Sequence, residues 1–146
     1  MLRWLGFALC LAMLCATAYA SAQVRMVRPG ATIVHDDFAY TVERVGTQHT
    51  GAGTNYQLTL RIENRAKRVP YQWRDRIAYV VDEYGRKYGP LSDETLELKA
   101  GSTALVHPRF HLPAPVHRAT LRFWDSVFMG DLFDGVQYAR TAVALY

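Results

Sequence analysis

Cysteine occurs only twice in this 146-residue chain, and both copies, Cys10 and Cys15, lie within the first 22 residues. The same segment has no acidic residue and carries Arg3 as its only charge. A basic start, an apolar stretch and a small-x-small ending are typical of a secretory signal peptide. The sequence therefore predicts a signal peptide over residues 1–22 that is cleaved before Gln23.

Apolar runs long enough to cross a bilayer are also missing. The apolar part of the leader is shorter than the roughly 20 residues that a membrane-spanning helix needs, which favours cleavage over an uncleaved anchor. Lipid attachment is disfavoured because leucine, rather than a small residue, precedes each cysteine. We therefore expect a secreted or periplasmic protein without disulfides and without stable membrane insertion.

Neither charge sign is concentrated in this sequence. Without Arg3 the chain has 16 basic and 13 acidic residues, a net charge of +3. A nucleic-acid-binding domain normally shows a dense basic stripe, so we expect no nucleic-acid partner. With no repeat or low-complexity tract, residues 23–146 are predicted to form one domain, which is long enough to be stable without crosslinks.

The clearest structural pattern is the alternation of apolar and polar residues from Tyr56 to Asn64. Tyr56, Leu58, Leu60 and Ile62 alternate with polar residues. A two-residue repeat places one set of side chains on one face of a strand, whereas a helix would scatter them around its axis. This stretch is predicted to be a central strand with one buried face.

Further short strands are expected on both sides of that strand, separated by turns. They are predicted at residues 31–34, 38–45, 77–82, 86–88, 103–112, 119–124 and 138–145, with a loop over 46–53 and a tight turn over 82–85. Seven to nine short strands and no long amphipathic helix indicate an all-β domain. An immunoglobulin-like antiparallel β-sandwich is favoured over a closed eight-stranded barrel, which remains the alternative.

Four features in this order resemble a known family, the bacterial secreted immunoglobulin-like domains of unknown function related to the mycobacterial immunoprotective extracellular protein. The matching segments are 37–42, 61–64, 79–88, and 98–101 followed by 110–113. The resemblance implies a signal-bearing, secreted or anchored β-sandwich with no established enzymatic activity, and it transfers no functional residues. The linker or lipid-attachment motif of many relatives is absent here.

Metal-ligating and catalytic patterns are weak. His107 and His111, four residues apart on a strand, would lie about 13 Å from each other, too far to share a zinc ion without a bend. We expect these two and His35 and His117 to be ordinary exposed histidines, and we expect no metal or cofactor.

Nucleophile motifs are equally weak. Without cysteine, a nucleophile would have to be a serine or threonine, and no serine lies in a glycine-flanked elbow. Paired carboxylates such as Asp93 and Glu94 show no sign of burial. The protein is therefore expected not to be an enzyme. Two alternatives stay open: a small secreted hydrolase or metal-dependent enzyme, and a lipocalin-like carrier of an apolar ligand.

The most suggestive stretch runs from Arg61 to Tyr88, where basic residues are interleaved with aromatic ones. Aromatic rings and guanidinium groups together can stack on sugars and hold carboxylates or phosphates. The candidate binding residues are Arg61, Arg65, Arg68, Tyr71, Trp73, Arg74 and Arg76. The alternative is a solvated sheet face whose tyrosines pack beneath arginine stems.

An apolar segment, Val127 to Phe133, is the last unusual feature. It is predicted either to close one end of the sandwich or to form an exposed patch for a partner or a second copy, so the oligomeric state stays open. Taken together, the sequence predicts a secreted or periplasmic, non-enzymatic binding module. Its partner would be a protein or an anionic glycan of the cell envelope.

Overall fold

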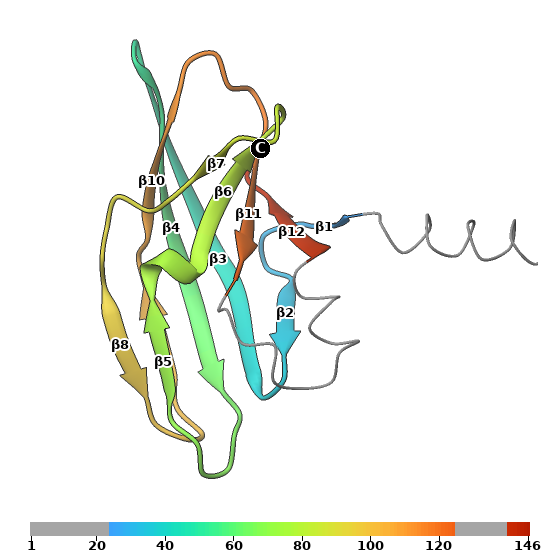
Figure 1. Ribbon diagram of the computed structural model, residues 1–146, viewed down its shortest axis with the longest axis vertical. Helices are drawn as coiled ribbons and strands as arrows, with labels where there is room; N and C mark the ends of the chain where they lie inside the picture. The colour runs from blue at the N-terminus through green and yellow to red at the C-terminus, as the bar shows by residue number, and fades with distance from the viewer. Residues whose placement is uncertain (1–23, 125–139) are drawn as a thin grey trace, which may run out of the picture.

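Two five-stranded β-sheets packed face to face form the main body of the fold (Figure 1). The computed structural model describes residues 24–124 and 140–146. The first sheet has the strand order β1-β12-β11-β6-β7. Its strands are β1 (Arg25–Val27), β12 (Thr141–Ala144), β11 (Ala119–Phe123), β6 (Ala78–Asp82) and β7 (Lys87–Tyr88). The pairing of β1 with β12 is parallel, and the other pairings are antiparallel.

The second sheet is built on the long hairpin of β3 and β4, which rises above the rest of the fold in Figure 1. Its order is β10-β4-β3-β2, and β9 pairs with a further part of β4. Its strands are β2 (Thr32–His35), β3 (Phe38–Thr50), β4 (Gly53–Asn64), β9 (Thr103–Val106) and β10 (Arg109–Pro113). A separate two-stranded ribbon joins β5 (Tyr71–Arg74) to β8 (Thr95–Leu98), and the short 3-10 helix η1 (Asp75–Ile77) leads from β5 into β6.

Strand β4 is central, as the alternation predicted. Leu58, Leu60 and Ile62 are fully buried and Tyr56 nearly so. Across the interior, the ring of Tyr40 stacks on that of Phe123 with centroids 5.0 Å apart. Side chains of both sheets thus fill the space between them. The predicted all-β sandwich is confirmed, and the barrel alternative is wrong.

Several details of the predicted strand pattern need correction. Residues 24–124 and 140–146 alone contain twelve strands rather than seven to nine, because short strands such as β1 and the unpredicted β5 add to the count. Residues 46–50, expected in a loop, continue β3 because they pair with residues 53–57 of β4. The expected strand over residues 103–112 is divided at His107 and Pro108 into β9 and β10.

Strand β6 is covered on much of both faces, since Val81 and Asp82 are buried as well as the residues of the core-facing side. Ala78 and Val80 are fully buried, whereas Tyr79 is half-buried on the other face. The predicted signal peptide and the apolar segment Val127–Phe133 lie outside the described residues, so both remain predictions. No helix within residues 24–124 and 140–146 is long and apolar enough to span a membrane.

Candidate functional site

The seven predicted binding residues lie in four different environments, not on one face. Two are in the core, two are in ion pairs on the second sheet, two are exposed cations elsewhere, and one lines a groove beside β6. The structure therefore does not bring the seven residues together on one binding face. The four environments have to be assessed one by one.

Tyr71 and Trp73 are core residues and not surface platforms. Trp73 is fully buried, and its indole Nε1–H donates to Asp75 Oδ1 at 3.0 Å. The hydroxyl of Tyr71 lies 2.7 Å from that of Tyr40 in a buried hydrogen bond. These two residues point inward because β5 alternates, with Gln72 and Arg74 on its exposed face. Neither can stack on a ligand at the surface, which corrects the prediction for this pair.

Arg61 and Arg65 are neutralised by neighbouring acids. Arg61 Nε lies 3.2 Å from Glu43 Oε1 and 3.6 Å from Glu63 Oε1. One guanidinium nitrogen of Arg65 lies 2.8 Å from Glu63 Oε2. Two cations and two carboxylates thus balance on this surface. An anionic ligand would meet no net positive charge here.

Arg68, Arg74 and Arg76 remain exposed, and no acid within the described residues forms an ion pair with them. Arg68 and Arg74 lie on the loop before β5 and at its end, away from any pocket described in the structure. Only Arg76, on η1, lies beside further polar and aromatic side chains. It is the predicted residue that the fold places in a candidate site.

That site is a groove of about 480 Å³ beside strand β6. It is lined by Arg76, Tyr79, Lys87, Tyr88, Gly89 and Trp124. Strand β7 is only two residues long, so the edge of β6 near Tyr79 has no partner strand among the described residues. The groove therefore lies at a part of the β6 edge that β7 does not cover.

Positive charge and aromatic surface combine in this groove, which we call the basic groove. The ammonium of Lys87 lies 5.5 Å from the centroid of the Tyr79 ring, within cation–π range. Trp124 is 42% exposed, and its backbone N–H is fixed to the carbonyl of Ile77 at 2.7 Å. No acidic residue lines the groove within the described part of the chain. It is therefore suited to an anion with a flat or ring-shaped body.

A further cation lies close to the basic groove. Arg122 on β11 is the register partner of Tyr79 on β6, so the two share the outer face of the first sheet. Its Nε is buried and has no hydrogen-bond partner within the described residues. A buried donor without a partner is costly unless a ligand or water satisfies it. This adds to the positive character of the face beside the groove.

One wall of the basic groove is held by the buried carboxylate of Asp82 at the β6–β7 turn. Asp82 Oδ1 accepts the backbone N–H groups of Tyr84 and Arg86, each at 2.9 Å. Its Oδ2 accepts Arg86 Nε at 2.6 Å and the Tyr88 hydroxyl at 2.9 Å. Gly85 completes the turn with a φ of 79°, which disfavours other residues.

These bonds set the protonation states at the turn. Burial acts to raise the pKa of Asp82, but the hydrogen bonds from Arg86, Tyr88 and the backbone outweigh it and lower that pKa to about 2. Burial and the bond to Asp82 raise the pKa of Tyr88. The turn therefore holds Tyr88 as a neutral phenol with a fixed orientation at the wall of the groove.

The histidines are more enclosed than expected. His35 is buried, 4% exposed, and its Nε2 lies 3.9 Å from Asp36 Oδ2. His111 is half-buried and bonded to Asn55 at 2.7 Å. Of the four histidines predicted to be exposed, His107 and His117 are exposed. Within the described ranges no group of three or more His, Cys, Asp or Glu side chains converges on a metal-sized site.

Sequence reasoning missed Tyr79, Lys87, Tyr88 and Trp124 as a group. The local pattern does not single out Tyr79, because every residue from Ile77 to Val81 is apolar or aromatic, which hides the alternation. Trp124 directly follows strand β11, more than 30 residues later in the chain. The available signal was the pair Lys87–Tyr88 directly after a glycine turn, which marks the end of a short edge strand.

Several solved structures have a fold similar to that of this chain. The chain is similar to the YjhA protein of Bacillus subtilis, with a TM-score of 0.57, 13% identity, and coverage of 84% of this chain and 99% of that one. It is similar to MPT63, a secreted protein of Mycobacterium tuberculosis, with a TM-score of 0.52, 10% identity, and coverage of 73% and 93%. It is also similar to an uncharacterized β-sandwich protein of Clostridium difficile, with a TM-score of 0.54, 11% identity, and coverage of 85% of this chain and 95% of that one.

No protein-family model and no curated protein matches this sequence. At these identities the structural likeness shows the fold and nothing of the activity. The sequence-based resemblance to the secreted immunoglobulin-like domains is thereby confirmed at the level of the fold.

Proposed function

We propose that this protein is a non-enzymatic binding module that acts outside the cytoplasm, belongs to the secreted immunoglobulin-like family, and binds an acidic polysaccharide of the cell envelope in the basic groove. The observation that carries the proposal is the convergence of two exposed cations, two half-buried tyrosines and the exposed Trp124 in a groove whose described lining has no acid. The leader-like first 22 residues and the secreted neighbour MPT63 support the location.

The chemistry of the basic groove suits an acidic sugar in particular. Arg76 and Lys87 provide charged donors for carboxylates, and charge-assisted hydrogen bonds are about twice as strong as neutral ones. Tyr79 and Trp124 provide rings on which the flat, apolar side of a sugar can pack. A volume of about 480 Å³ is in the range of ordinary ligand sites.

The proposal is tested by calorimetric titration of the purified protein with polygalacturonate, a polymer with one carboxylate per sugar. The variant Arg76→Gln/Lys87→Gln removes two groove cations, and Arg68→Gln/Arg74→Gln removes two exposed cations outside the groove. We expect the groove variant to weaken binding by tenfold or more, because each lost charge-assisted bond contributes about 1.5–3 kcal/mol. The matched control Arg68→Gln/Arg74→Gln should change the affinity for polygalacturonate much less.

Equal weakening by both double variants would show attraction by general charge and overturn the site. Absence of any binding would overturn the acidic polysaccharide as ligand. In parallel, the immobilised protein is exposed to an envelope extract. Reproducible capture of one protein, lost in the groove variant, would replace the polysaccharide by a protein partner at the same groove.

A further inference from the structure

We infer that a second hollow, on the β3–β4–β10 sheet, is a binding site for a single acidic sugar unit. It rests on the proposed function only in taking the ligand class to be an acidic saccharide. The hollow has a volume of about 420 Å³. Its lining includes Gly46, Gln48, Asn55, Gln57, Leu91 and Arg109, and none of these belongs to the basic groove.

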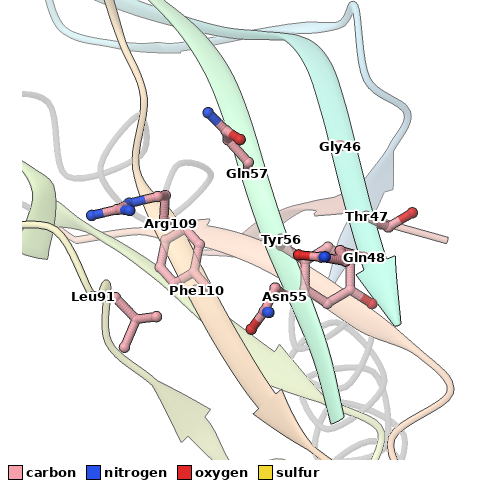
Figure 2. A pocket seen from close by; sticks show the side chains of 9 residues that line it. All are labelled: Gly46, Thr47, Gln48, Asn55, Tyr56, Gln57, Leu91, Arg109 and Phe110. Atoms are coloured by element: carbon pink, nitrogen blue, oxygen red, sulfur yellow. The ribbon is translucent and has the colours of Figure 1, made fainter. Parts of the chain in front are cut away.

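Strand register brings the polar side chains of this hollow together. Gln57 on β4 is the register partner of both Gly46 on β3 and Arg109 on β10, and Gln48 is the partner of Asn55. Register partners share a face, and residues two apart on a strand do so as well. Three strands thus present a guanidinium and three amides on one surface. Figure 2 shows Gln57 and Arg109 on adjacent strands of this site.

Glycine at position 46 opens the space between these side chains. A Cβ at this position would lie 3.4 Å from the backbone oxygen of Gln57, so even a small side chain would occupy part of the hollow. The open side is bounded by Leu91, which is 65% exposed. The backbone N–H of Leu91 donates to the carbonyl of Arg109 at 2.7 Å, which fixes this apolar wall to β10.

The polar groups of the hollow have unused hydrogen-bonding capacity. Within the described residues, the side chains of Gln48, Gln57 and Arg109 make no hydrogen bond or ion pair. His111 Nδ1 donates to Asn55 Oδ1 at 2.7 Å, which orients the Asn55 amide and leaves its NH₂ donors unused. Side-chain amides both donate and accept hydrogen bonds, as binding to the neighbouring hydroxyls of a sugar requires. The guanidinium of Arg109 can in addition donate two parallel hydrogen bonds to one carboxylate. No acid lines the hollow among the residues described.

The test uses ¹⁵N-labelled protein titrated with galacturonic acid, and with galactose as the matched neutral sugar. We expect galacturonic acid to shift the amide signals of Asn55 and Gln57 and to bind at least tenfold tighter than galactose, because only the acid engages Arg109. In Arg109→Gln, the affinity for galacturonic acid should fall to that for galactose. Gly46→Val should abolish the shifts by filling the hollow, and valine suits a strand.

The groove variant Arg76→Gln/Lys87→Gln serves as the control and should leave these shifts unchanged. Persistence of the shifts at full strength in both Arg109→Gln and Gly46→Val would overturn the second site, as would equal binding of the two sugars. If Gly46→Val fails to fold, Arg109→Gln decides alone, since its side chain is exposed. Polygalacturonate binding that depends on Arg76 and Lys87 but leaves Asn55 and Gln57 unshifted would reject this site and keep the proposed function. Shifts of Asn55 and Gln57 together with polygalacturonate binding that does not depend on Arg76 and Lys87 would support this second site and reject the basic groove.

Discussion

Replacing Trp73 by phenylalanine tests most directly whether this residue belongs to the core or to a binding face. The indole is fully buried and donates its N–H to Asp75 Oδ1 at 3.0 Å. Asp75 is itself fully buried, and its Oδ2 accepts the backbone N–H of Glu94 at 3.1 Å. Phenylalanine keeps a ring in place but cannot donate, so one carboxylate oxygen loses its side-chain donor.

The expected cost follows from these contacts. A hydrogen bond to a charged group contributes about 1.5–3 kcal/mol, and the smaller ring adds a loss of buried contact area. A lowering of the free energy of unfolding by about 2–4 kcal/mol is a large part of the 5–15 kcal/mol typical of a domain. It should lower the melting temperature by roughly 5–15 °C.

Urea unfolding followed by far-ultraviolet circular dichroism measures this change at pH 7. Trp124→Phe is the matched control, because Trp124 is 42% exposed and its replacement should leave stability nearly unchanged. A double-mutant cycle with Asp75→Asn should show positive coupling between the two side chains. Wild-type stability of Trp73→Phe together with weakened polygalacturonate binding would refute the core assignment and restore Trp73 as a ligand contact.

Two further perturbations test the turn and the core. Asp82 has a folded pKa of about 2, below its ordinary 3.8, so its contribution to stability is present above about pH 4 and is lost as the pH falls through 2. Urea midpoints measured from pH 5 to pH 2 should therefore fall more steeply in wild type than in Asp82→Asn, and parallel curves would contradict the network. Leu60 is fully buried between Val42 and Val106, so Leu60→Asp should abolish the dispersed amide spectrum of the fold, whereas Gln57→Asp on the exposed face should retain it. A dispersed spectrum for Leu60→Asp would mean that β4 is not central.

The site assignments separate what local sequence can and cannot specify. Tyr71 and Trp73 sit in a stretch rich in arginine, which made them attractive ligand contacts. Their burial comes from the pairing of β5 with β8, a partner more than 20 residues away. Likewise, the charge on Arg61 is cancelled by Glu43, which the β3–β4 pairing brings to within 3.2 Å. Neither effect leaves a trace in the local pattern of residues.

By itself the sequence determined the elements whose cause is local. The two-residue alternation from Tyr56 to Ile62 fixed a strand and its buried face, and Asp82 and Gly85 fixed a tight turn, because these depend on side-chain direction and backbone φ. The tertiary structure alone decided which cations stay unpaired. It also decided that Arg76, Lys87 and Trp124 meet in one groove, since that depends on strand order and register between segments distant in the chain.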